Sequence, residues 1–493
     1  MKLSQLLVEC HYKLMKGNLD TNVELISYHT RRVKPDSVFV CIDGIVTDGN
    51  NYIEEAIQLG AVAIVTSKQD VNMDYDNITF IYVEDTRKAL ASMSTVFFDY
   101  PAKKLKVIGV TGTKGKTTTT YLIRDILEQA GIKTCLIGTI ETIIGDTAIP
   151  SINTTPESYM VQKTMSKAVE EGCQCVVMEV SSQGLKLSRV DGIIFDYAVF
   201  MNLGTDHIGE NEHKDFEEYR DCKRMLFERC KTGIFNMDDE HAQYMLEHCS
   251  GNIETFAVKK SAKLRALNEK LYRNGYLLGT SFDVAGWYDT HITLSIPGLF
   301  NVYNALAAMS VVSHFEVREN VIKNAFSNAR IKGRVEHVPI RAQYTLLIDY
   351  AHNAMSLSNV LKTVNEYEHN QIYCMFGCGG NRDKNRRCEM GEVSAKYADI
   401  TVITNDNPRF EKPEDIIEDI ISGVEKEEAT YVVIKDRKEA IRFCMKNAQP
   451  GDIVILAGKG HETYQEIKGI KYPMDERELI CEICQEEGIT IYH

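Results

Sequence analysis

The sequence lacks any apolar run of about 18 residues, so it predicts no transmembrane helix. Its first residues, MKLSQLLVECHYKL, contain no sustained apolar segment and no small-residue cleavage site, and we therefore expect no signal peptide. It also lacks an excess of positive charge, because 56 Lys and Arg stand against 70 Asp and Glu, for a formal net charge of −14. This balance argues against a protein that holds nucleic acid by its phosphates.

The 14 cysteines form no regular framework, and the one CxxC, at Cys481 and Cys484, has no second pair at zinc-finger spacing. We expect reduced cysteines in a cytoplasmic protein with neither membrane nor nucleic-acid partners. No internal repeat or low-complexity segment is present. A length of 493 residues, with 44% hydrophobic and 26% charged residues, is typical of a globular chain of about three domains.

Apolar segments and breaks along the chain predict three α/β domains. Strand-like segments in the first hundred residues are SVFVCI, AVAIVT and TFIYV, followed by a linker at 100–104. The next group is KVIGV, KTCLIGT, CQCVVMEV and YAVFMNL, and a break near Ile331–Arg334 precedes TLLIDYAH, QIYCMFGCGG, DITVITNDNPR, TYVVIKDR and DIVILAGKGHE. Continuous apolar strands of this kind are covered by helices on both faces. We expect domains at 1–100, 101–332 and 333–493: a small α/β domain, a central P-loop domain with a parallel or mixed sheet, and a C-terminal Rossmann-like, doubly wound sheet.

The segment around Lys116 predicts a phosphate site. The strand KVIGV leads into Thr111-Gly112-Thr113-Lys114-Gly115-Lys116-Thr117 and then into a helix. Glycines let backbone N–H groups approach phosphate oxygens, and the helix N-terminus adds positive potential. Lys116 would reach the terminal phosphates and Thr117 would ligate Mg²⁺. Val110 occupies the first glycine position of the strict pattern, so an ordinary βα turn is the alternative.

Polar residues at other strand ends extend this prediction. Glu179 follows CQCVVMEV, and Asp206 and His207 follow YAVFMNL, where they are candidate Mg²⁺ partners. In the last domain, Arg382 and Arg409 can each grip a carboxylate, whereas Asp406 and Glu462 can hold an ammonium group. A plain tight turn at GCGG and an Asx-Pro turn at NDNPR are the alternatives.

Eleven motifs, in order, resemble the Mur ligase family: VTGTKGKTTT, NTTPES, MEVSSQGL, NLGTDH, EEYRDCKRMLF, GLFNVYNALAA, GRVEHV, DYAHN, FGCGGNRDK, DNPR and AGKGHE. The resemblance spans nearly the whole chain, and it is to the members that add the third amino acid of the peptidoglycan stem peptide. It implies ATP-dependent amide synthesis. A D-Glu carboxylate attacks the γ-phosphate of ATP, and the amine of an amino acid then attacks the resulting acyl phosphate.

The resemblance also implies residue roles. Lys116, Glu179, His207, Lys223 and Arg334 would be catalytic, and Thr117, Glu179, His207 and a carbamylated Lys223 would support Mg²⁺. The ATP site would comprise Gly112, Thr113, Lys114, Gly115, Lys116, Thr117, Thr118, Asn301, Asn304, Arg334 and Asp349. Thr30 and Arg31 would begin the uridine site, and Thr154, Thr155, Ser181 and Arg189 would contact the sugar-peptide. Arg382, Asp406, Asn407, Arg409, Gly458 and Glu462 would bind the amino acid. Without the resemblance, Lys223 is typical of a helix-surface lysine.

The DNPR motif favours meso-diaminopimelate as the amino acid. Lysine-using members usually carry another residue at the position of Arg409, and lysine would leave this arginine unpaired, at a cost of a few kcal/mol. We therefore expect a monomeric ligase that acts on UDP-MurNAc-L-Ala-D-Glu and diaminopimelate.

The sequence departs from the family pattern at Asn50, Lys114, Gln183, Asn353-Ala354 and the segment DHIGENEH. A paralogue that uses another amino acid, such as L-lysine, or a modified nucleotide substrate is therefore an open alternative. Two other classes are a dinucleotide-binding oxidoreductase, suggested by FGCGG with Asp399 downstream, and a non-catalytic ATP-binding scaffold. Phosphate release that depends on both substrates would separate the three.

Overall fold

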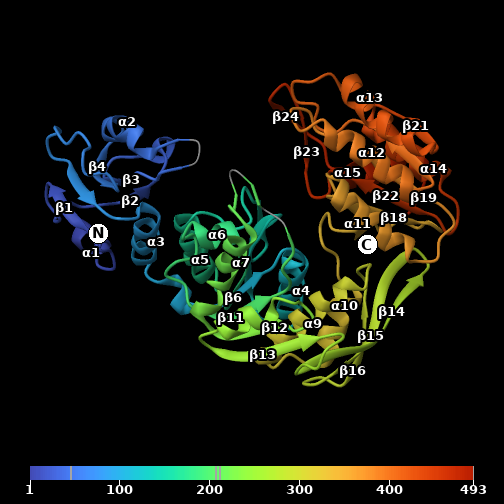
Figure 1. Cartoon of the computed structure of the whole chain (residues 1–493), viewed down its shortest axis with the longest axis horizontal. Helices are drawn as coiled ribbons and strands as arrows, with labels where there is room; N and C mark the ends of the chain where they lie inside the picture. The colour runs from blue at the N-terminus through green and yellow to red at the C-terminus, as the bar shows by residue number, and fades with distance from the viewer. Residues whose placement is uncertain (45–46, 206–207, 210–211, 492–493) are drawn as a thin grey trace. The chain divides into compact units, whose positions relative to one another are not determined.

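The computed structural model describes residues 1–44, 47–205, 208–209 and 212–491. It divides into two compact units, Met1–Lys263 with Ala307–Arg318, and Leu264–Leu306 with Glu319–His493 (Figure 1). Helix α9 (Phe300–Val312) therefore belongs to both units. No helix in the described ranges combines the length and the apolar character needed to cross a membrane.

The first sheet has five strands in the order β1-β5-β4-β3-β2, with β1 antiparallel and the others parallel. Its strands are β1 (Lys13–Lys16), β2 (Leu25–Ser27), β3 (Ser37–Val40), β4 (Ala61–Thr66) and β5 (Thr79–Tyr82). Its helices are α1 (Leu3–Leu6), α2 (Ile53–Gln58) and α3 (Thr86–Phe97). In β3, Val38 and Val40 face one core while Phe39 faces another, so both faces of the sheet are covered. The three predicted strands of this region are confirmed as β3, β4 and β5.

The central sheet of the first unit runs in the order β13-β12-β11-β6-β10-β7-β8-β9. The strands from β13 to β7 are parallel, and β8 and β9 form an antiparallel extension. The strands are β6 (Lys106–Thr111), β7 (Thr134–Ile137), β8 (Glu141–Ile144), β9 (Thr147–Pro150), β10 (Cys175–Glu179), β11 (Phe195–Phe200), β12 (Cys230–Asn236) and β13 (Asn252–Ala257). The helices are α4 (Lys116–Gln129), α5 (Ser158–Glu170), α6 (Ser182–Lys186), α7 (Phe216–Arg224) and α8 (Ala242–Glu247). The predicted mixed sheet is thus confirmed.

The second unit contains an antiparallel three-stranded segment and a six-stranded sheet in the order β17-β18-β22-β19-β20-β21, in which only β17 is antiparallel. The segment comprises β14 (Leu264–Asn274), β15 (Leu277–Ala285) and β16 (Thr290–Leu294). The sheet comprises β17 (Glu336–His337), β18 (Thr345–Asp349), β19 (Ile372–Phe376), β20 (Ile400–Ile403), β21 (Tyr431–Val433) and β22 (Ile453–Ala457). A separate hairpin pairs β23 (Tyr464–Ile467) with β24 (Ile470–Pro473).

Helices cover both faces of the six-stranded sheet. They are α11 (Ala354–Asn365), α12 (Asn385–Tyr397) and α13 (Pro413–Val424) on one face and α14 (Arg437–Asn447) and α15 (Glu476–Glu487) on the other, while α10 (Glu319–Ser327) packs near β16. In β22, Ile453 and Ile455 join the first core whereas Val454 and Leu456 join the second. This double burial explains the unbroken apolar sequence of the strand. The predicted doubly wound sheet is confirmed.

Candidate functional site

The phosphate loop connects β6 to the first turn of α4. Gly112 and Gly115 adopt φ angles of 153° and 88°, which glycine reaches without strain. A β-carbon at Gly112 would lie 2.9 Å from the Cβ of Met201, so no larger residue fits there. Val110 is fully buried within β6, which explains why the glycine-rich segment begins two residues later than in the strict pattern. The predicted strand, loop and helix are therefore present.

Polar contacts hold this loop in shape. Lys116 on α4 donates from Nζ to the carbonyls of Gly112 (2.8 Å) and Thr113 (3.1 Å). The backbone N–H of Lys114 donates to Asn202 Oδ1 (2.9 Å), and Asn202 Nδ2 donates to the Lys114 carbonyl (3.0 Å). These contacts use only the backbone of Lys114, and its side chain is exposed. The lysine that departs from the family pattern here therefore leaves the loop's hydrogen bonds intact. Thr118 is half-buried in the first turn of α4.

Glu179 lies at the end of β10, directly beside the phosphate loop. Its Oε2 accepts hydrogen bonds from the hydroxyls of Thr117 and Thr139, both at 3.0 Å, and its Oε1 accepts from the Thr139 N–H at 2.8 Å. Its side chain is almost completely buried. A carboxylate and a threonine hydroxyl 3.0 Å apart form an oxygen donor set of the kind that Mg²⁺ prefers.

Two of the predicted metal partners, Asp206 and His207, lie outside the described residues. Within the part of the chain that the structure describes, no three His, Cys, Asp or Glu side chains gather as a ready metal cluster.

Lys223 on α7 is buried, which corrects the helix-surface position that its sequence alone suggests. Its Nζ donates to the Gly112 carbonyl at 3.0 Å and lies 4.6 Å from the centre of the Tyr219 ring. The Gly112 carbonyl thus accepts from both Lys116 and Lys223. The fold therefore brings Lys223 to the phosphate loop.

The predicted sugar-peptide residues gather beyond β10. Thr155 Oγ1 donates to the Glu179 carbonyl (2.9 Å) and accepts from the Ser181 N–H (3.0 Å). Arg189 donates to the Thr155 carbonyl at 2.9 Å. The hydroxyls of Thr154 and Thr139 lie 3.0 Å apart, which connects the group to Glu179. The four predicted residues thus belong to one hydrogen-bonded network.

Glu157 links this network to helix α3 beside the N-terminal sheet. It pairs with Arg189 at 2.8 Å and with Arg87 of α3 at 3.2 Å. Thr30 and Arg31 lie in a short 3₁₀ helix (Thr30–Arg32), where the Arg31 N–H donates to His29 Nδ1 at 3.2 Å. Among the described residues, no hydrogen bond joins Thr30 or Arg31 to the Thr155 network.

The remaining predicted ATP residues belong to the second unit. Asn304 donates to Asn301 Oδ1 at 2.6 Å, and both side chains are buried in α9. Asp349 ends β18 and accepts from the N–H groups of Val335 and Ala351, each at 2.7 Å. Burial raises the pKa of Asp349, while the nearby Arg334 guanidinium opposes this shift.

The six predicted amino-acid-binding residues surround one cavity of about 220 Å³ at the carboxyl ends of β18, β19, β20 and β22. They are Arg382, Asp406, Asn407, Arg409, Gly458 and Glu462. Gly458 has a φ angle of 103°, and a β-carbon there would approach Asp406 Oδ2 to 3.2 Å. The cavity therefore presents cations and carboxylates together, as the strand-end argument predicted.

Arg409 is held firmly at the edge of this cavity. Its Nε donates to Glu466 Oε2 at 3.0 Å and its Nη1 donates to the Gly380 carbonyl at 2.8 Å. Its backbone adopts a left-handed φ of 51°. Two backbone hydrogen bonds support this conformation: the Arg409 N–H donates to the Glu466 carbonyl, and the Lys468 N–H donates to the Arg409 carbonyl. The side chain is 20% exposed, so a ligand can reach it.

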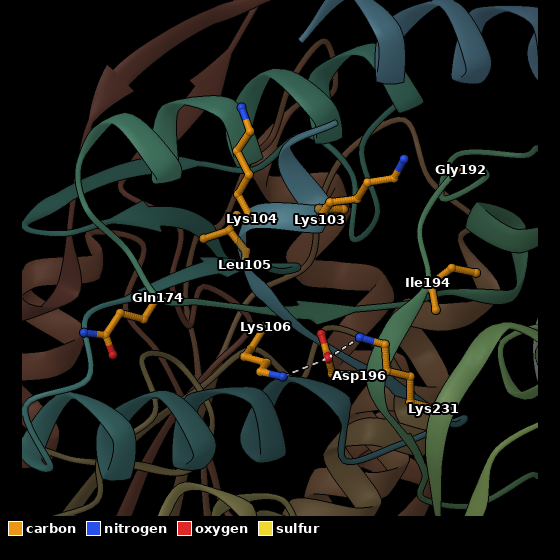
Figure 2. A pocket seen from close by; sticks show the side chains of 10 residues that line it. Lys103, Lys104, Leu105, Lys106, Gln174, Gly192, Ile194, Asp196 and Lys231 are labelled. Carbon is orange, nitrogen blue, oxygen red and sulfur yellow. Dashed lines mark hydrogen bonds and ion pairs between the residues drawn. The ribbon is translucent and has the colours of Figure 1, made fainter. Parts of the chain in front are cut away.

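A larger cavity, of about 430 Å³, lies at the amino-terminal ends of the central strands, opposite the phosphate loop. Lys106 and Lys231 turn toward Asp196 there, whereas Lys103 and Lys104 extend away from it (Figure 2). The Nζ–Oδ1 distances are 3.3 Å from Lys106 and 2.8 Å from Lys231. These two ammonium groups thus bridge neighbouring strands through one buried carboxylate, and the predicted site residues are absent from this cavity's lining.

Sequence reasoning missed several residues of these sites. Thr139 and Asn202 follow β7 and β11, so the strand-end rule would have found them. His213 is fully buried with Nε2 2.9 Å from Ser182 Oγ, and Lys459 is buried beneath the mixed-charge cavity. No local pattern in the sequence distinguishes these last two.

These features define an α/β protein with a phosphate-binding loop on one sheet and a mixed-charge pocket on another. Three family descriptions match the chain: "Mur ligase family, catalytic domain" over residues 22–98, "Mur ligase middle domain" over 110–312 and "Mur ligase, glutamate ligase domain" over 333–460. The chain therefore belongs to the Mur ligase family.

Individual relatives support this placement. The chain is 44% identical to the UDP-N-acetylmuramoyl-L-alanyl-D-glutamate–2,6-diaminopimelate ligase of Caldanaerobacter subterraneus subsp. tengcongensis, over 99% of each chain. A solved structure of a ligase with the same name matches with a TM-score of 0.70 and 26% identity, covering 99% of this chain and 100% of the other. The MurF ligase of Thermotoga maritima, solved in complex with ADP, shares the fold with a TM-score of 0.55 and 17% identity, covering 95% and 98%.

Proposed function

We propose that this protein is an ATP-dependent ligase that joins meso-diaminopimelate to UDP-MurNAc-L-Ala-D-Glu in peptidoglycan precursor synthesis. The observation that carries the proposal is the mixed-charge cavity, where Arg382 and Arg409 meet Asp406 and Glu462. Diaminopimelate has two carboxylates and two ammonium groups, and such a ligand can satisfy both signs of charge. The full-length relatives named as diaminopimelate ligases support the same assignment.

The first half of the reaction would take place at the phosphate loop. The carboxylate of D-Glu attacks the γ-phosphorus of ATP, the bond to ADP breaks, and an acyl phosphate forms. The loop N–H groups and Lys116 hold the phosphates and balance the negative charge that develops on them. Thr113, Thr118, Asn301, Asn304, Arg334 and Asp349 are proposed to complete the ATP site, with Arg334 toward the γ-phosphate and Asp349 toward the ribose.

Mg²⁺ fits the oxygen donors at this end of β10. Thr117 and Glu179 would hold it, and we propose His207 as a further partner. A bound Mg²⁺ neutralises phosphate charge and orients the phosphoryl group.

Lys223 is proposed to be carbamylated. A carbamate on Nζ keeps one N–H, so the hydrogen bond to the Gly112 carbonyl can persist while the added carboxylate supports the metal. Carbon-13 NMR of protein equilibrated with labelled bicarbonate should show a carbamate signal, and Lys223→Arg should abolish both the signal and the activity. A labelled signal that persists in the variant would contradict this assignment.

The second half of the reaction requires the amine of diaminopimelate to attack the acyl phosphate carbonyl. The tetrahedral intermediate then expels phosphate and leaves the amide. Residues of the mixed-charge cavity do the positioning in this step, because the acyl phosphate is already a good electrophile. Arg382 and Arg409 would pair with carboxylates, whereas Asp406 and Glu462 would receive an ammonium group. Asn407, whose Oδ1 already accepts from Lys459 and from the Glu466 N–H, would hold Glu462 in place through its amide nitrogen.

The nucleotide substrate is proposed to lie along the first unit. Thr30 and Arg31 would begin the uridine site, and the Thr155 network with Thr154, Ser181 and Arg189 would hold the sugar-peptide. We propose domain limits of 1–100, 101–332 and 333–493, a monomeric state, and action in the cytoplasm, where ATP and nucleotide-linked precursors are available.

The decisive experiment is ATP-dependent phosphate release with UDP-MurNAc-L-Ala-D-Glu, comparing meso-diaminopimelate, L-lysine and L-ornithine. We expect release with diaminopimelate. Phosphate release only with another amino acid would support the ligase activity but contradict the proposed specificity. No phosphate release with any of the three amino acids would overturn the proposal. Lys116→Ala should abolish release, whereas Lys103→Ala, an exposed lysine at the other cavity, should not.

A further inference from the structure

A fully buried lysine, Lys459, lies beneath the mixed-charge cavity without lining it. Its Nζ donates to Asn407 Oδ1 at 2.7 Å, to Glu462 Oε2 at 3.2 Å and to the carbonyl of Tyr464 at 2.8 Å. It also lies 3.6 Å from Asp406 Oδ1. One buried ammonium group thus contacts three of the six residues that are proposed to bind the amino acid.

We propose that Lys459 is a positioning residue that fixes Asn407 and Glu462 in the orientation that an ammonium-bearing amino acid requires. This inference rests on the proposed function and assigns a role to a residue that does not touch the substrate.

Lys459 helps to orient the side-chain amide of Asn407. Its Oδ1 accepts from Lys459 Nζ and also from the Glu466 N–H at 2.8 Å. With two donors on the oxygen, the amide nitrogen is directed to Glu462 Oε2, at 3.0 Å. Without Lys459, the Asn407 oxygen keeps only the hydrogen bond from the Glu466 N–H. The side-chain amide can then rotate by 180°, which exchanges its oxygen and its nitrogen.

Lys459 also balances negative charge at the cavity. Asp406 and Glu462 are two carboxylates in a partly buried cavity, and Lys459 compensates one of them. Arg437 also lies 3.9 Å from Asp406, but it pairs with the buried Glu476 at 2.8 Å. Asp406, Glu462 and Lys459 together therefore carry one net negative charge, which suits a single ammonium group.

Lys459 and Asn407 hold the Glu462 carboxylate through one of its two oxygens. The described hydrogen bonds from Lys459 and Asn407 to this carboxylate both use Oε2. Oε1 is therefore the oxygen that a ligand's ammonium group would meet. A side chain held through one oxygen presents the other in a defined place, which reduces the entropy lost when a ligand binds.

The test is steady-state kinetics and calorimetric binding on the full-length Lys459→Met variant. Methionine keeps a similar chain length and removes the charge and the three donors. We expect the KM for diaminopimelate to rise about tenfold or more, because buried charged hydrogen bonds are lost. The KM values for ATP and for the nucleotide substrate should stay within about twofold, and kcat at saturating diaminopimelate should be largely retained.

Two comparison variants make the result specific. Lys459→Arg keeps the cation and should recover part of the diaminopimelate affinity. Lys438→Met removes a half-buried lysine of α14, paired with Glu482 and Glu486 away from the cavity lining, and should leave every KM unchanged. If Lys459→Met fails to fold, Lys459→Gln, which keeps a donor but no charge, is measured in its place with the same expected rise.

An unchanged KM for diaminopimelate would overturn the inference. An equal rise in all three KM values, or a loss of kcat that follows a fall in Tm, would also overturn it, because both indicate a purely structural role. The proposed function fails separately, when the wild-type protein itself releases no phosphate with diaminopimelate.

Discussion

Replacing Arg409 by alanine should weaken the use of diaminopimelate far more than the use of ATP. A charged hydrogen bond to a carboxylate contributes about 1.5–3 kcal/mol, which corresponds to roughly a ten- to 150-fold change in KM. Because the Arg409 side chain is 20% exposed, we expect the lower part of this range. Glu466, which loses its partner in the variant, is 22% exposed, so water can replace the guanidinium without a large loss of stability.

Arg409→Lys provides the matched control. Lysine keeps the charge but lacks the planar fork that contacts both Glu466 and the Gly380 carbonyl, so its KM for diaminopimelate should fall between those of the wild type and the alanine variant. The assay is phosphate release at saturating ATP and nucleotide substrate, with diaminopimelate varied, and then with ATP varied. Equal losses for diaminopimelate and ATP would refute the carboxylate role of Arg409.

Three further outcomes can be checked independently. Burial lowers the pKa of His337 from 6.5 to about 4, so the folded state favours the neutral imidazole. The contribution of His337 to the unfolding free energy should therefore be complete above pH 6.5 and should fall by roughly 3 kcal/mol as the pH drops through 4. Urea titrations should show this loss in the wild type and not in His337→Gln. Gly112→Ala should reduce kcat/KM for ATP about tenfold or more because its β-carbon meets Met201, whereas Gly204→Ala, with nothing within 4 Å, should not; comparable values for the two would contradict the close packing of the loop. Thr139→Val keeps the shape but removes the hydroxyl that contacts Glu179, so kcat should fall about tenfold with little change in Tm; a normal kcat would remove Thr139 from the site.

The strands of the two doubly covered sheets were predictable, because burial on both faces leaves an unbroken apolar sequence, as in β22. The strands β8, β9, β14 and β15 were missed because exposed or half-buried residues interrupt their buried residues and, in β9, make up the whole strand. Position at a strand end was enough to bring Asp406 and Glu462 into one predicted site.

Buried cations were the part of the site that the sequence could not reveal. Charged residues are normally assigned to the surface, and only tertiary packing shows that Lys223 reaches the Gly112 carbonyl and that Lys459 reaches Asn407. The role of Lys223 could be inferred from family resemblance, but the role of Lys459 required the hydrogen-bond geometry.

Every residue proposed to recognise the amino acid, together with Lys459 beneath them, belongs to the second unit, whereas the phosphate loop belongs to the first. The proposed amino-acid site and the phosphate loop are thus encoded in separate stretches of the chain, although the proposed ATP residues Asn301, Asn304, Arg334 and Asp349 lie in the second unit. Substitutions in the loops after β19, β20 and β22 can change which amino acid is accepted while Lys116 and Glu179 stay untouched. Such a division would let the amino acid that is accepted change while the phosphate loop keeps its sequence.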